Sequence, residues 1–146
     1  MKTILLIHGV NLNLLGKREW EHYGTLTLGQ LEKLTSDFAK GRGFKILAFQ
    51  SNHEGALVDF LQKESPNAEG IIINPGAFTH YSYALHDAIL DTRLPAIEVH
   101  LSKINQRESW SKKSVIAEAC VAVISGRKEK GYLNALEKLD KIINKT

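Results

Sequence analysis

Residues 70–74 are Gly70-Ile-Ile-Ile-Asn74, a short apolar run that stops just before Pro75. A continuous apolar run of this length, without polar alternation, is typical of a β-strand that is buried on both faces. Similar runs occur at residues 3–7, 44–49, 96–100 and 119–124. The sequence therefore predicts five buried strands.

Segments with helical character separate these runs. Thr27-Leu-Gly-Gln30 resembles a capping box, which begins a helix, and the glycines at 41 and 43 end it. Further helices are expected from Ser51-Asn-His-Glu54 to before Pro66, at about 81–91 and at 131–143.

The alternation of strands and helices determines the fold class. Parallel strands that are joined by right-handed helical crossovers place helices on both faces of one sheet. We therefore expect an α/β protein with a flavodoxin-like, five-stranded parallel sheet in the order 2-1-3-4-5. The 146 residues suit one domain, and no repeat or linker divides them, so residues 1–146 are expected to form a single domain.

Composition and charge exclude several classes of protein. Hydrophobic residues make up 43% and charged residues 24% of the chain, as is usual for a globular domain. The net charge is only +3 and the lysines are scattered, so no nucleic acid partner is expected. No apolar run is long enough to span a membrane or to act as a signal peptide. The single cysteine, Cys120, agrees with a reducing, cytoplasmic location.

A long polar loop, at about residues 8–24, follows the first strand and carries Asn11, Arg18 and Tyr23. A compact domain seldom keeps so long an irregular connection unless it is a lid or a binding loop. A tyrosine becomes a usable base only where a nearby cation favours the phenolate. Because Arg18 and Tyr23 share the loop, we expect a lid that carries a base together with its cation.

Polar residues also follow the third and fourth strands, as Asn74-Pro-Gly-Ala-Phe-Thr-His80 and His100-Leu-Ser102. In an open parallel sheet, ligands bind beyond the carboxyl ends of the strands, where the strand order reverses. The first, third and fourth strands are neighbours in the order 2-1-3-4-5. Both segments and the 8–24 loop are therefore expected to converge on one cleft.

The residue types in this cleft suit acid–base chemistry on an anionic substrate. Asn74 and the backbone N–H groups after it suit a carboxylate, and Ser102 adds a hydroxyl. Glu98 and His100 lie on one face of their strand, so Glu98 can orient the imidazole and His100 is a candidate general acid. With a phenolate at Tyr23, the set predicts proton abstraction beside a carbonyl, with loss of a leaving group.

Each of these assignments has a structural alternative on spacing alone. Tyr23 precedes a glycine, where a tyrosine is usually a turn residue, and an arginine such as Arg18 is more often a solvated loop charge. His100 also fits a hydrogen-bonded core histidine, and His80 a residue that flanks a helix.

Three motifs together resemble one known family. They are Asn11-Leu-Asn-Leu-Leu-Gly-Lys-Arg-Glu19 with Tyr23-Gly24, then Asn74-Pro-Gly-Ala-Phe-Thr-His-Tyr-Ser-Tyr-Ala-Leu-His-Asp87, and then Ile97-Glu-Val-His-Leu-Ser102. In this order they closely resemble the type II 3-dehydroquinate dehydratases of the shikimate pathway. The resemblance spans nearly the whole chain.

This resemblance implies an enzyme that dehydrates 3-dehydroquinate to 3-dehydroshikimate through an enolate, with no metal and no organic cofactor. Tyr23 would remove the C2 proton, and Arg18 would hold Tyr23 in its phenolate form. Asn11 would help to bind the water that stabilises the enolate. His100, backed by Glu98, would protonate the departing C1 hydroxyl.

The resemblance also implies a substrate-binding set and a homo-oligomer, a dodecamer built as a tetramer of trimers. Asn74, Leu101 and Ser102 would hold the substrate carboxylate. His80 would bind a ring hydroxyl, and Asp87 would reach the site of a neighbouring subunit.

The chain departs from the family pattern at several positions. His8-Gly-Val-Asn11 stands where the family usually has Asn-Gly-Pro-Asn, and Glu19-Trp20 where it usually has Glu-Pro. The family commonly has a substrate-contacting arginine four residues after the arginine that matches Arg107. That position is Ser111 here, followed by two lysines. Lysine supplies charge but not the planar fork of donors, so weakened substrate binding is expected.

Three other functions stay open. A flavodoxin-like electron carrier would need a Ser/Thr-rich phosphate loop after the first strand, and residues 8–11 contain no hydroxyl. A phosphoreceiver would need an aspartate at the position of Asn74. A degenerate or altered-substrate homologue that binds a related cyclic carboxylate is compatible with the departures.

Overall fold

A computed structural model describes residues 1–17, 26–103 and 113–145 of the chain. Five strands form one parallel sheet in the order β2-β1-β3-β4-β5, which confirms the predicted flavodoxin-like fold. The strands are β1 (Lys2–His8), β2 (Phe44–Gln50), β3 (Gly70–Asn74), β4 (Ala96–His100) and β5 (Ala122–Ser125).

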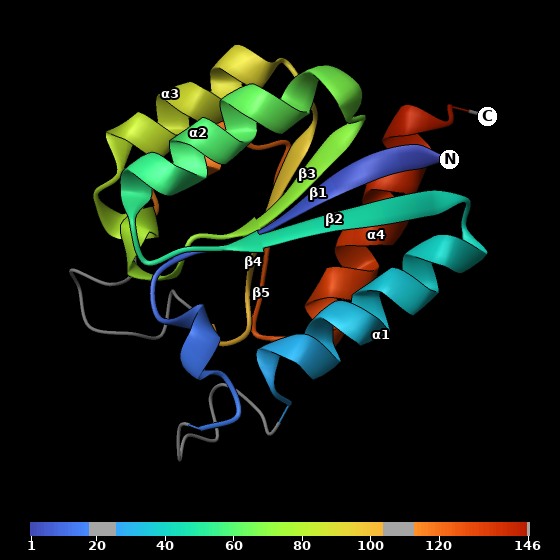
Figure 1. The fold of residues 1–146 in the computed structure, drawn as a ribbon, viewed down its shortest axis with the longest axis horizontal. Coiled ribbons are helices and arrows are strands. Elements are labelled where there is room, and N and C mark those ends of the chain that lie inside the picture. Colours follow the sequence, from blue (N-terminus) through green and yellow to red (C-terminus); the bar gives the residue numbers. More distant parts are fainter. Residues whose placement is uncertain (18–25, 104–112, 146) are drawn as a thin grey trace.

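Helices cover both faces of the sheet, α2 and α3 on one and α1 and α4 on the other (Figure 1). The helices are α1 (Leu28–Gly41), α2 (Glu54–Glu64), α3 (Tyr83–Thr92) and α4 (Lys130–Ile143). Short 3-10 helices are η1 (Leu12–Leu14), η2 (Ser65–Asn67), η3 (Gly76–His80) and η6 (Ala117–Ala119). No helix in the described part of the chain has both the length and the apolar character needed to cross a membrane.

The two faces of the sheet enclose separate hydrophobic cores. Successive residues of a strand point to opposite faces, so Ile4 and Leu6 of β1 pack with α1 and α4. Leu5 and Ile7 pack with α2 and α3. Strands β1 and β3 supply side chains to both cores, which explains why their sequences are apolar without alternation.

Helix α1 begins as the sequence predicts. The Thr27 hydroxyl accepts the Gln30 N–H at 3.1 Å, and the Gln30 side chain accepts the Thr27 N–H at 2.9 Å, which completes the capping box. Helix α2 begins later than Ser51, because the Ser51 hydroxyl accepts the His53 N–H at 2.9 Å and forms a turn before the helix.

The fifth strand is shorter than the sequence predicts. It begins at Ala122 instead of residue 119 because the N–H groups of Ala119 and Cys120 bond to the carbonyls of Ile116 and Ala117. Ala119, Cys120 and Val121 are apolar but precede the strand, so hydrophobicity alone does not reveal where it begins.

Two glycines let the segments after β1 and β3 pack backbone against backbone. A Cβ on Gly9 would lie 2.0 Å from the Pro75 carbonyl oxygen, and a Cβ on Gly76 would lie 2.5 Å from that of Val10. Gly76 also has φ of 62°, which glycine adopts readily. The Gly9 N–H bonds to the Asn74 carbonyl at 2.7 Å. Larger residues at either position would push these two segments apart.

Candidate active site

The predicted site residues of β3 and β4 lie at the carboxyl edge of the sheet. Asn74 ends β3 and His100 ends β4, and both side chains are almost fully buried. His8, at the end of β1, pairs in register with Asn74. The structure therefore gathers polar groups at the edge where ligands of open parallel sheets bind.

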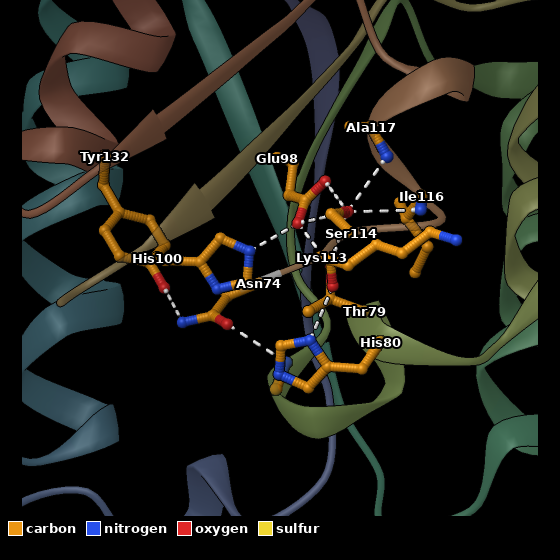
Figure 2. A network of polar contacts seen from close by, with 11 residues as sticks. Asn74, Thr79, His80, Glu98, His100, Lys113, Ser114, Ile116, Ala117 and Tyr132 are labelled. Atoms are coloured by element: carbon orange, nitrogen blue, oxygen red, sulfur yellow. Dashed lines mark hydrogen bonds and ion pairs between the residues drawn. The ribbon is translucent and has the colours of Figure 1, made fainter. Parts of the chain in front are cut away.

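Glu98 and His100 form a buried pair on one face of β4. Nε2 of His100 contacts Oε2 of Glu98, and His100 is only 2% exposed (Figure 2). A carboxylate accepts hydrogen bonds, so this contact places a proton on Nε2. The nitrogen that is left to exchange a proton with a ligand is Nδ1.

Two hydroxyls hold the Glu98 carboxylate from the other side. Thr79 of η3 donates to Oε2, and Ser114 lies 2.8 Å from Oε1 and 2.9 Å from Oε2. The Ser114 hydroxyl in turn accepts the N–H groups of Ile116 at 3.2 Å and Ala117 at 3.0 Å. These contacts fix the carboxylate, and through it the imidazole (Figure 2).

The same contacts decide the charge of Glu98. Burial raises its pKa, but the hydrogen bond and charge of His100 and the hydrogen bonds of Thr79 and Ser114 together lower the pKa below its usual value. Glu98 is therefore a carboxylate at neutral pH, and it fixes the orientation of the His100 ring.

Asn74 is held in one orientation by two hydrogen bonds. Its side-chain oxygen accepts the Gly76 N–H at 3.1 Å, and its Nδ2 donates to the Tyr132 hydroxyl of α4 at 3.1 Å (Figure 2). Burial raises the pKa of Tyr132, so this phenol stays neutral. Nδ2 carries a second N–H, which can donate to an anionic ligand.

The other described site residues have different settings. Nδ1 of His80 lies 2.7 Å from the Lys113 carbonyl oxygen, which ties η3 to the segment before Ser114. The Leu101 side chain is buried in the α1/α4 core, so a ligand can reach only its backbone. Ser102 is half-buried, and the Asn11 N–H bonds to the Asn52 side chain at 2.9 Å.

Asp87 lies apart from the strand ends, on α3. Its side chain is 75% exposed and pairs with Nδ1 of His86 at 2.9 Å. Arg18 and Tyr23 lie outside the described residues, as does Ser111.

Sequence reasoning missed three residues that shape the site: Thr79, Ser114 and Tyr132. Thr79 belongs to the segment after β3 that the sequence marks as polar, so its hydroxyl was a usable signal. Ser114 and Tyr132 gave none, because their partners lie 16 and 58 residues away in the chain. Within residues 1–17, 26–103 and 113–145, no cluster of three or more His, Cys, Asp or Glu side chains is placed to hold a metal ion.

With acid–base groups at the carboxyl edge of a flavodoxin-like sheet, the protein is an α/β enzyme. Residues 2–140 match the model of the family described as dehydroquinase class II, and the chain belongs to that family.

Its relatives support the same assignment over nearly the full chain. A 3-dehydroquinate dehydratase from Caldicellulosiruptor saccharolyticus is 51% identical over 144 residues, which cover 98% of this chain and 99% of the relative. One from Roseiflexus castenholzii is 52% identical over 134 residues, 92% of this chain and 85% of the relative. The crystal structure of a type II dehydroquinase from Butyrivibrio crossotus has a TM-score of 0.92 and 41% identity, and covers 95% of this chain and 97% of that one.

Proposed function

We propose that the chain catalyses the reaction for which its relatives are named, the dehydration of 3-dehydroquinate to 3-dehydroshikimate. The observation that carries this proposal is the buried Glu98–His100 pair beside Asn74 at the carboxyl edge of the sheet. Loss of water from a β-hydroxy ketone needs a base for the proton beside the carbonyl and an acid for the departing hydroxyl. The chain offers a candidate for each.

His100 is the proposed acid. Its Nε2 is bound to Glu98, so Nδ1 would give its proton to the C1 hydroxyl as the C1–O bond breaks. The Glu98 carboxylate stabilises the imidazolium before this step. A positioned acid or base of this kind contributes roughly 10²- to 10⁴-fold in rate.

Tyr23 is the proposed base, with the Arg18 guanidinium favouring its phenolate form. It would take the C2 proton and leave an enolate, and Asn11 would help to bind a water that donates to the enolate oxygen. These three assignments rest on the loop sequence and its resemblance to the family.

The proposed substrate pocket holds the carboxylate at Asn74 and at the backbone of Leu101 and Ser102. The fixed orientation of Asn74 supports this, because a preset donor loses little freedom when it binds an anion. His80 would bind a ring hydroxyl. Asp87 would reach the site of a neighbouring subunit, which fits its exposed position on α3.

We further propose a cytoplasmic homo-oligomer, a dodecamer assembled as a tetramer of trimers. Tyr81 and Tyr83 are 58% and 62% exposed, and Leu90 of α3 is 50% exposed. Large apolar side chains that gather near one helix favour a protein contact there. An interface on this side would bring Asp87 to another subunit.

The test is direct. Purified protein given 3-dehydroquinate should produce the ultraviolet absorbance of a conjugated enone without added metal. Tyr23→Phe should lose this activity while its circular dichroism spectrum stays that of the wild type. A wild-type protein that gives no enone would refute the proposal.

An altered-substrate homologue is the competing hypothesis; Ser111 motivates it, and the names of the relatives do not favour it. Thermal unfolding with 3-dehydroquinate, quinate and shikimate separates the two, because a ligand that binds the native state raises the unfolding temperature. The largest shift with quinate or shikimate, together with no turnover of 3-dehydroquinate, would favour the competing hypothesis.

A further inference from the structure

His8 is a buried titratable residue that the proposed mechanism does not use. It is 0% exposed, and its Nε2 lies 3.1 Å from Oε2 of Glu32 in α1. Its Nδ1 is buried and has no hydrogen-bond partner in the described part of the chain. Buried polar atoms are nearly always hydrogen-bonded, so a buried ring nitrogen without a partner calls for an explanation.

The fold places His8 next to the proposed carboxylate pocket. His8 pairs in register with Asn74 of β3, and neighbouring strands lie about 4.8 Å apart. His8 shares the face of Ile4 and Leu6 by the two-residue period, and these pack with α1 and α4. Asn74 points to the same face, because it bonds to Tyr132 of α4. The two side chains therefore lie side by side.

Within residues 1–17, 26–103 and 113–145, the groups around His8 come from α1, α4, β2 and β3. Glu32 of α1 is the anion, and its side chain is 32% exposed. Tyr132 of α4 is a neutral phenol, because burial raises its pKa. The in-register neighbours of His8, which are Gln50 of β2 and Asn74 of β3, are uncharged amides.

The protonation state of His8 therefore sets the net charge of the His8–Glu32 pair beside Asn74. With a neutral imidazole, the pair with Glu32 carries one negative charge. With an imidazolium, the pair is neutral and Nδ1 becomes an N–H donor. The first state repels an anion at Asn74, and the second does not.

We propose that His8 is a positioning residue that strengthens carboxylate binding at Asn74 when it is protonated, with Glu32 as its counter-ion. The inference rests on the proposed function, in which Asn74 holds the substrate carboxylate. His8 touches no reacting atom, so its effect falls on KM and on ligand affinity.

The experiment compares the wild type with His8→Gln and Glu32→Gln between pH 5.5 and 8.5, where histidines change charge. Glutamine at position 8 keeps a donor for Glu32 but cannot be protonated. We expect KM for 3-dehydroquinate to rise with pH about fivefold more in the wild type than in His8→Gln. At low pH, KM of His8→Gln should exceed that of the wild type, with kcat little changed.

Glu32→Gln is expected to change KM in the opposite direction. Removing the anion should lower KM at high pH, whereas a merely structural His8–Glu32 contact would make both variants weaker in the same way. If His8→Gln does not fold, His8→Asn serves, since its amide is also uncharged at every pH.

A wild type that turns over the substrate, with the same pH dependence of KM in His8→Gln, would overturn this inference alone. Absence of turnover would overturn the proposed function instead. In that case calorimetric titration with quinate still tests His8, because quinate carries the same carboxylate. Quinate affinity that depends on pH equally in the wild type and in His8→Gln would refute the role of His8.

Discussion

The carboxylate of Glu98 gathers three side-chain donors, from His100, Thr79 and Ser114. Hydrogen bonds to a charged acceptor are stronger than neutral ones, and burial removes competition from water. One residue therefore contributes both to stability and to the orientation of the proposed acid.

Ser114→Ala should lower the free energy of unfolding by about 2 kcal/mol at neutral pH, because a hydrogen bond to a buried charge is lost. The folded-state pKa of Glu98 is lowered, so its stabilisation is full above its usual value of 4.5 and is lost as pH falls through the folded-state pKa. The deficit of the variant should shrink in acid.

Urea unfolding of both proteins from pH 3 to pH 8 measures this. The difference should not vanish in acid, since the N–H groups of Ile116 and Ala117 also lose the Ser114 hydroxyl. A deficit that grows as pH falls would contradict the charge assigned to Glu98.

Glu98→Gln should reduce kcat by roughly 10²- to 10⁴-fold, because the neutral amide no longer stabilises an imidazolium at His100. The isosteric side chain preserves the packing, so the fold should persist by circular dichroism. Steady-state kinetics checks the effect, and a kcat close to the wild-type value would contradict the proposed acid.

Residue-level prediction from the sequence succeeds where geometry is local. The two-residue period of a strand places Glu98 and His100 on one face, and the structure shows them in contact. Ser114 belongs to a segment whose position relative to β4 no local sequence pattern determines. Prediction fails there because the contact depends on the tertiary fold.

At the scale of elements, close packing between the segments that follow β1 and β3 shapes the site. Gly9 and Gly76 allow the segments after β1 and β3 to interlock, and the Gly9 N–H bonds to the Asn74 carbonyl. The position of Asn74 therefore depends on a backbone contact that tolerates no side chain.

Gly9→Ala should cost about 1–3 kcal/mol of stability, since its Cβ would meet the Pro75 carbonyl, and it should also reduce activity by displacing Asn74. Gly55→Ala is the matched control. It lies in α2 with nothing within 4 Å of a new Cβ and should stabilise by about 0.5 kcal/mol. Urea unfolding and the enone assay measure stability and activity of both variants. A Gly9→Ala variant with wild-type stability and activity would contradict the close backbone contact between Gly9 and Pro75.

Element boundaries show what periodicity can and cannot provide. The central strands β3 and β4 match their predicted ranges, because polar or turn residues bound each of them. The start of β5 differs by three residues, since a 3-10 turn precedes it. Ala119, Cys120 and Val121 are apolar, so hydrophobicity alone extends the predicted strand back to the turn, although no residue of the turn is buried.

At the scale of the whole molecule, the proposed oligomer depends on the exposed surface near α3. Asp87 is exposed there, close in sequence to the exposed Tyr81 and Tyr83. If Asp87 completes the site of a neighbour, no isolated subunit has a full site.

Subunit complementation tests this arrangement. Tyr23→Phe and Asp87→Ala should each have little activity alone, but a co-assembled mixture should recover up to about a quarter of wild-type activity. Recovery arises because some sites pair an intact Tyr23 with an intact Asp87 from the next subunit. Native mass spectrometry verifies mixing, and mixed assemblies that stay inactive would contradict the shared site.

The two hydrophobic cores lie on opposite sides of the sheet, and the proposed chemistry divides between them. Asn74 and His8 point to the α1/α4 side, whereas Glu98 contacts Thr79 and Ser114, which adjoin the α2/α3 side. Different layers of the fold therefore hold the two neighbouring groups of the proposed site. A change in the packing of α4 would shift Asn74 through Tyr132 while the contacts of Glu98 with Thr79 and Ser114 stay in place.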